Sequence, residues 1–226
     1  MIQVLGRHLS LRQRALATAE IYISRFFTKA SIHEVNLYLV IATCVYVACK
    51  AEECPQHIRT ITSEARSLWP EYITHDATKI AECEFYLMEE LETHLIVHHP
   101  YKSLREFSQA MTGQLTLSQE ELQSAWSMIN DSYATDLILL YAPHIIAMAC
   151  IYITIVLKSP LMRPTRPPER IKARIDLLVS FLGESGIDLD RIADCIQEMI
   201  SLYIRWENYD EESCKQAIKK QILRIQ

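Results

Sequence analysis

The sequence predicts an all-α protein built from two similar helical domains in tandem. Two long uncharged runs, residues 37–49 and 143–157, indicate this, because each is long for a strand and normal for a buried helix. The chain has 226 residues, half of them hydrophobic, and only four glycines, which is typical of helix-rich proteins. The two runs also match each other, since residues 44–47 (CVYV) align with residues 150–153 (CIYI). An internal repeat at this spacing predicts two domains of one plan.

The first run is expected to form the central helix of the first domain. Leu37–Cys49 contains no charged or strongly polar side chain, so a helix here is apolar on every face and must be surrounded by other helices. Several of its residues are β-branched, which favours a strand, but the length of the run decides for a helix. The charged residues Lys50, Glu52 and Glu53 follow at its end. Pro55 then stops the helix.

Further helices are predicted from capping-box patterns, in which a serine precedes a glutamate or glutamine by three residues. These patterns begin at Ser10, Ser31, Ser103 and Ser118. We expect the pattern at Ser31 to open the central helix, and the one at Ser118 to open a helix to about Leu140. The other expected helices span residues 57–68, 76–95, 170–182, 188–207 and 211–225.

The start of the chain, residues 1–8, has the pattern of a helix end, so we expect the first helix to be truncated. We place the first domain at residues 1–98 and the second, with a C-terminal helix, at residues 99–226. The segment Ser159–Arg170 holds four prolines and three arginines and is expected to be a loop. It is either a solvated basic loop or a binding site for an acidic partner.

Glu84 interrupts the apolar face of the helix predicted after Asp76. The apolar residues of that face recur at helical spacing and are Ile80, Leu87, Met88, Leu91 and Leu95. A carboxylate on such a face needs a partner, because burying it unpaired costs several kcal/mol. The alternative is that Glu84 lies in water at the edge of the stripe.

The charged cluster that begins at Lys50 has two interpretations, a solvated helix end or a binding site for a partner. The internal repeat bears on this choice, because Lys50 corresponds in register to Val156 and no acidic pair follows in the second copy. A device needed only to end a buried helix would be expected in both copies. The asymmetry therefore favours a binding role for the cluster in the first domain.

Composition argues against several other classes of protein. Seven cysteines without a C-x-x-C pair indicate reduced thiols in an intracellular protein and neither a disulfide nor a metal site. The adjacent His98 and His99 diverge and do not suggest a metal site. No apolar run is long enough to span a bilayer, and a net charge of −5 argues against a general nucleic-acid-binding surface.

Several stretches resemble the cyclin family. Ala42–Glu53 (ATCVYVACKAEE) is similar to the cyclin box, in which such a run ends the third helix of the first repeat. Three longer blocks are similar to the C-type cyclins of the Mediator kinase module, in a fungal form. These blocks are His57–Pro70, Glu82–Tyr101 and Ala125–Tyr141. The resemblance, from about Leu9 to Tyr209, implies a tandem cyclin fold of two repeats with about five helices each.

The resemblance implies a regulatory subunit that binds the Mediator-associated cyclin-dependent kinase and performs no chemistry itself. The cyclin residues that bind the kinase beside its regulatory helix fall on Lys50 and Glu84. Glu53 belongs to the same Lys-x-Glu-Glu motif, and Met88 and Leu91 would supply the apolar part of the contact. Binding would hold the kinase's regulatory helix inward, so that the kinase's own Lys–Glu pair and metal site assemble. Other Mediator kinase-module subunits are further implied partners, in the nucleus, in control of RNA polymerase II transcription.

Two departures from the family pattern and two alternative functions remain. Compared with the family, we expect the N-terminal extension and the complete first helix to be truncated in this chain, which predicts reduced kinase affinity, and no substrate-docking groove is assigned. Ala142 replaces a proline usual at the start of the second repeat, without consequence for the fold.

One alternative is a DNA-binding general transcription factor of the same fold, which needs a basic face. The other is a helical enzyme, for which the sequence shows no nucleophile–base or metal-ligand spacing.

Overall fold

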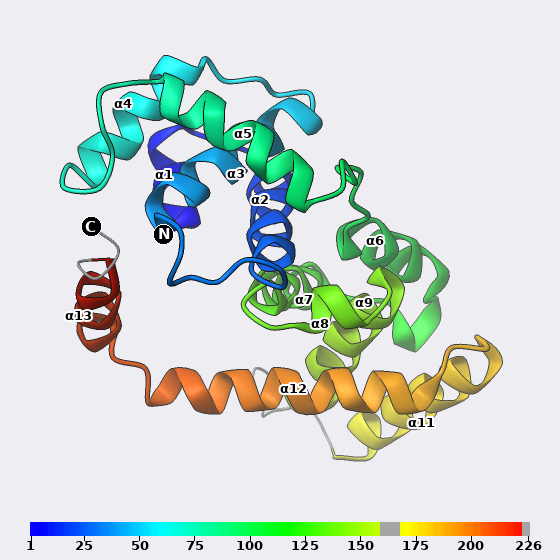
Figure 1. The fold of residues 1–226 in the computed structure, drawn as a ribbon. Helices are drawn as coiled ribbons and strands as arrows, with labels where there is room; N and C mark the ends of the chain where they lie inside the picture. Colours follow the sequence, from blue (N-terminus) through cyan, green and yellow to red (C-terminus); the bar gives the residue numbers. More distant parts are fainter. Residues whose placement is uncertain (159–167, 223–226) are drawn as a thin grey trace. The chain divides into compact units, whose positions relative to one another are not determined.

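A computed structural model describes residues 1–158 and 168–222 of the chain. Within these residues all regular structure is helical and no strand is present, which confirms the predicted all-α class. The chain divides into two compact units, one made of residues 1–97 with 209–226 and the other of residues 98–208 (Figure 1). None of the helices described combines the length and hydropathy that a membrane crossing requires.

The first unit is arranged around the helix α3 (Leu37–Ala51). The other helices of this unit are α1 (Ile2–His8), α2 (Gln13–Phe26), α4 (Ile58–Leu68), α5 (Thr78–Glu90) and α13 (Glu211–Ile222). Of these, α1, α2, α4 and α5 pack against α3 (Figure 1). Nearly every α3 side chain from Leu37 to Cys49 is buried. The structure therefore confirms the predicted central helix of the first domain.

Asn36 caps the start of α3. Its Oδ1 atom accepts hydrogen bonds from the backbone N–H groups of Tyr38 at 3.1 Å and Leu39 at 3.3 Å. These groups have no partner inside the helix, and asparagine is among the residues best suited to satisfy them. The prediction that Ser31 opens this helix is wrong, because Ser31 lies in a preceding turn where its hydroxyl accepts from the N–H of His33.

Two other capping-box predictions are also wrong. Ser10 has a backbone φ of +51° just after α1, and the N–H of Leu11 bonds to the carbonyl of Gly6 at 2.9 Å. Ser10 is thus the left-handed residue that ends α1, and α2 begins later, at Gln13. Ser103 lies inside α6, whose first residue is Pro100, because proline suits the first helical position and sets the start of the helix.

Two predicted helices are shorter in the structure than in the sequence analysis. The helix α5 ends at Glu90 and does not reach Leu95, since Glu92 and Thr93 both adopt left-handed φ values. The capping box at Ser118 is present with both of its hydrogen bonds, as predicted. The helix it opens ends at Ser132, however, and a separate short helix covers the residues before Tyr141.

The second unit is arranged around α9 (Pro143–Tyr152) and its continuation η2 (Ile153–Lys158), which has π-helical hydrogen bonding. Ile145–Ile151 are buried, as predicted for the second central helix. The other elements of this unit are α6 (Pro100–Ala110), η1 (Gly113–Leu115), α7 (Gln119–Ser132), α8 (Leu137–Leu140), α11 (Pro168–Glu184) and α12 (Leu189–Glu207). Most of the predicted loop Ser159–Arg170, residues 159–167, lies outside the described residues.

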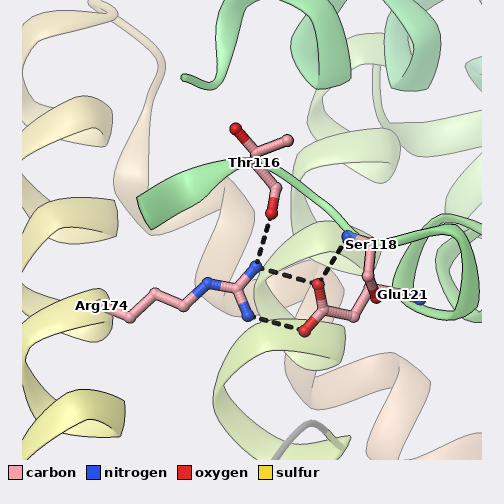
Figure 2. Close-up of polar contacts among 4 residues, drawn as sticks. All are labelled: Thr116, Ser118, Glu121 and Arg174. Atoms are coloured by element: carbon pink, nitrogen blue, oxygen red, sulfur yellow. Dashed lines mark hydrogen bonds and ion pairs between the residues drawn. The ribbon is translucent and has the colours of Figure 1, made fainter. Parts of the chain in front are cut away.

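A buried ion pair ties α11 to the start of α7 in the second unit. Arg174 donates from Nη1 to Glu121 Oε1 at 2.6 Å and from Nη2 to Oε2 at 3.0 Å (Figure 2). Arg174 Nη2 also donates to the carbonyl of Thr116 at 3.3 Å, while Glu121 accepts from the N–H of Ser118 at 2.9 Å. Additional hydrogen bonds of this kind help a desolvated pair to be tolerated. Among the residues that the structure describes, Arg174 Nε remains buried without a hydrogen-bond partner.

Candidate partner-binding site

Lys50 and Glu84 form an ion pair at the surface of the first unit. Lys50 lies in the last turn of α3, and its Nζ contacts Oε1 of Glu84, which lies in the middle of α5. The Lys50 side chain is 46% exposed and the Glu84 side chain 18%. Tyr46, one turn earlier on α3, presents its ring 4.9 Å from Lys50 Nζ in a cation–π contact. Lys50 is therefore the partner that the sequence analysis required for Glu84.

The backbone after Lys50 ends α3 in a Schellman motif. The N–H of Cys54 donates to the carbonyl of Cys49 at 2.9 Å, and the N–H of Glu53 donates to the carbonyl of Lys50 at 3.3 Å. Glu53 occupies the left-handed position of this motif with a φ of +54°, a conformation that glycine adopts most easily. As a result the Glu53 side chain is exposed at the tip of the helix.

Glu52 points the other way, into the first unit. Its side chain is only 8% exposed, pairs with Arg14 Nε at 2.5 Å and accepts a hydrogen bond from Thr18 Oγ1 at 2.7 Å. Both partners lie on α2, so Glu52 holds the end of α3 against that helix. This role of Glu52 was not predicted from the sequence, although Arg14 and Thr18 are four residues apart and share a helix face.

The apolar surface beside the ion pair differs from the one expected. Met88 is half-buried, but Leu91 is only 5% exposed and belongs to the core of the unit. Phe85, next to Glu84 on α5, is 78% exposed. Phe85 was not among the predicted site residues, although an aromatic residue just off the apolar stripe of the helix is a signal for exposure that the sequence contains. The site thus combines a charged pair with one large exposed apolar side chain.

The chemistry of this surface suits recognition. In the part of the chain that the structure describes, no group of three or more His, Cys, Asp or Glu side chains is placed to hold a metal ion. Lys50 and Glu84 offer one donor group and one acceptor group of opposite charge, fixed on the two helices that meet there. Such a pair can bind a partner that carries complementary charges in the matching order.

The chain is similar in sequence to known proteins along nearly its whole length. The family model of the cyclin N-terminal domain matches residues 1–96, which include all five residues predicted to bind a partner. The RNA polymerase II holoenzyme cyclin-like subunit of Yarrowia lipolytica is 61% identical over 225 residues, covering 98% of this chain and 80% of that protein. This chain belongs to the cyclin family.

This cyclin is also similar to a second fungal relative and to two solved structures. The protein of the same description from Saccharomyces cerevisiae is 51% identical, covering 95% of this chain and 71% of its own length. A chain of the CAK complex from Chaetomium thermophilum matches with a TM-score of 0.70 at 20% identity. The match covers 100% of this cyclin and 70% of the CAK chain. A chain of the yeast TFIIK complex matches with a TM-score of 0.64 at 23% identity. That match covers 89% of this cyclin and 80% of the TFIIK chain. At these identities the two structures show the fold alone, and they confirm the predicted tandem cyclin fold.

Proposed function

We propose that this cyclin is a non-catalytic regulatory subunit that binds and activates a cyclin-dependent kinase in RNA polymerase II transcription. The observation that carries the proposal is the Lys50–Glu84 pair, which is partly exposed and has no counterpart in the second repeat. The names of the relatives, RNA polymerase II holoenzyme cyclin-like subunits, support it.

The geometry suggests how the kinase would be held. In the free chain Lys50 and Glu84 keep each other in place, and each retains hydrogen-bonding capacity for a partner. The kinase would offer an acceptor to Lys50 and a donor to Glu84 beside its regulatory helix, with Phe85 and Met88 as the apolar part of the contact. Leu91 would support this surface from below. Fixing the regulatory helix inward lets the kinase assemble its own Lys–Glu pair and metal site.

The more specific part of the proposal concerns the partners. The kinase is the Mediator-associated cyclin-dependent kinase, the further partners are other subunits of the Mediator kinase module, and the location is the nucleus. The three sequence blocks similar to C-type cyclins support this assignment over other transcription kinases. A DNA-binding role for this fold is disfavoured by the net charge of −5.

The test is a titration of the Mediator-associated kinase against Lys50→Glu and Glu84→Lys. Each change removes one partner of a contact that the kinase desolvates, so affinity should fall about 30-fold or more, equivalent to roughly 2–5 kcal/mol. The free energy of unfolding should change by about 1 kcal/mol or less, because the intrachain pair is partly exposed to water. Thermal melts of the same variants measure this second quantity.

Two matched variants sharpen the result. The double exchange Lys50→Glu with Glu84→Lys restores an intrachain pair and wild-type stability, but presents both charges in the wrong order and should still fail to bind. Lys29→Glu disrupts another exposed ion pair of the same unit, with Glu92 at 2.5 Å, and should bind normally. Wild-type kinase affinity for Lys50→Glu, or loss of binding with Lys29→Glu as well, would contradict the proposed site.

A further inference from the structure

A pocket of about 770 Å³ opens between α4 and the loop that leads to α5. Two arginines of α4, Arg59 and Arg66, line it together with His75 and Asp76 of the loop. The arginines are seven residues apart, which is two helical turns, so they lie on the same face of α4. No residue of this pocket belongs to the proposed kinase-binding site.

Neither arginine has an anionic partner among the residues that the structure describes. Neither guanidinium makes an ion pair or a hydrogen bond to any residue in the ranges that the structure covers. Nη1 of Arg66 is moreover buried without a hydrogen-bond partner. Leaving a buried charged donor unsatisfied is costly, and such a group in a native protein calls for an explanation. A negatively charged ligand in the pocket provides one.

The other groups of the pocket indicate what else the ligand carries. Ser63 and Ser67 place exposed hydroxyls on the same stretch of α4 and can donate to the oxygens of an anion. The carboxylate of Asp76 accepts from the N–H of Thr78 at 2.9 Å and from its hydroxyl at 2.6 Å. These hydrogen bonds hold the pKa of the Asp76 carboxyl below its ordinary value, so it stays charged. A ligand that suits this pocket therefore presents an anionic group to the arginines and a donor to Asp76.

We propose that this pocket binds a phosphoserine or phosphothreonine side chain of a partner protein. Two guanidinium groups match the near-divalent charge and the several oxygens of a phosphoryl group, and a peptide backbone supplies N–H donors for Asp76. The choice of a phosphorylated protein rests on the proposed function, because a protein kinase produces these groups. The helix α5 begins at the pocket with Thr78 and reaches Glu84 six residues later, about 9 Å along its axis. A phosphorylated segment is thus captured on the unit that holds the kinase.

The experiment measures binding of the purified full chain to degenerate peptide pools centred on phosphoserine, glutamate or serine, and to inorganic phosphate. Wild type binds the phosphoserine pool more tightly than the other three probes. Arg66→Gln and Arg59→Gln each weaken that binding about tenfold or more, as expected for loss of a hydrogen bond to a charged group. Arg12→Gln, which removes an exposed arginine of the same unit outside the pocket, leaves it unchanged.

Two further measurements separate this proposal from a structural role and from the proposed function. Arg66→Gln melts no lower than wild type, since it removes an unsatisfied buried donor, and it binds the kinase with wild-type affinity. Equal binding of the serine or glutamate pool, inorganic phosphate binding as tightly as the phosphoserine pool, or full binding by both arginine variants would overturn the proposal. Wild-type kinase affinity of Lys50→Glu would overturn the proposed kinase site without changing the phosphopeptide result, so the two failures are distinguishable.

Discussion

Glu52 and Glu53 are neighbours in sequence, yet their side chains do different things. Glu52 is bound to Arg14 and Thr18 of α2 and stabilises the packing of α3. Glu53 takes a left-handed backbone conformation that costs about 1–2 kcal/mol for a residue with a Cβ atom. Strain of this kind persists where the surrounding structure imposes it, and it is common at functional sites. We interpret the exposed Glu53 carboxylate as kept for the partner at some cost in stability.

Replacing Glu53 with glycine tests this interpretation. Glycine adopts the left-handed conformation without steric cost, so Glu53→Gly should raise the free energy of unfolding by up to about 1 kcal/mol. The same change removes a carboxylate of the proposed site and should weaken kinase binding. Urea unfolding and a kinase titration measure the two effects. A less stable variant would show that Glu53 serves the fold, and wild-type kinase affinity would show that its carboxylate is not part of the kinase contact.

Arg174 offers a second prediction for a single residue. Arg174→Leu leaves the Glu121 carboxylate buried without its cation and should cost about 3–5 kcal/mol in the free energy of unfolding. Adding Glu121→Gln removes the stranded charge and should recover part of the loss, as measured by urea unfolding. Arg191→Leu is the matched control, because its pair with Asp188, at 3.3 Å, is exposed. Its effect should be about 0.5 kcal/mol or less, and a similar loss in both variants would contradict the argument.

The helices themselves were well predicted, whereas their ends were not. The uncharged run Leu37–Cys49 predicts α3 because its length exceeds that of an ordinary buried strand, and the structure buries nearly all of it. The capping-box pattern is short and recurs by chance, so Ser31 matched it although Asn36 is the cap. Which polar residue caps a helix depends on where the preceding chain turns, and that is set by packing.

The start of α3 gives a prediction that separates the two candidate caps. Asn36→Ala removes the side-chain acceptor for two backbone N–H groups and a hydrogen bond from its Nδ2 to the Tyr72 carbonyl at 2.9 Å. We expect a loss of about 0.5–2 kcal/mol in the free energy of unfolding, read from thermal or urea melts. Ser31→Ala should change it by about 0.5 kcal/mol or less. The reverse order of the two effects would restore Ser31 as the cap.

The charged residues of the candidate site could be predicted from the sequence, whereas the exposure of its apolar residues could not. Glu84 on an apolar face and Lys50 without a counterpart in the second repeat are visible in the sequence, and the structure joins them in one pair. The exposure of Phe85 and the burial of Leu91 depend on how α5 is rotated against its neighbours. When a charged residue lies within the apolar stripe, the sequence pattern does not decide which of two neighbouring residues the helix turns toward the core.

Across the whole molecule, the seven cysteines lie in very different environments. All seven are free thiols, with four of them buried, namely Cys44, Cys49, Cys150 and Cys195. Burial disfavours the thiolate and raises the pKa of Cys49 and Cys195 to about 12, and it also raises the pKa values of Cys44 and Cys150. Cys214 of α13 is exposed. The thiolate is the reactive form, so reactivity should follow this division.

Native alkylation followed by mass spectrometry tests the division and the predicted absence of disulfides and zinc. At neutral pH iodoacetamide should modify Cys214 first and leave the four buried cysteines unmodified, because their thiolate forms are populated only far above neutral pH. Unfolding in urea without reductant should then expose all seven thiols to alkylation, and elemental analysis of protein purified without added metal should find no stoichiometric zinc. Fewer than seven modifications after unfolding would indicate a disulfide. Rapid native modification of Cys49, at the end of α3, would mean that this helix opens at neutral pH next to Lys50.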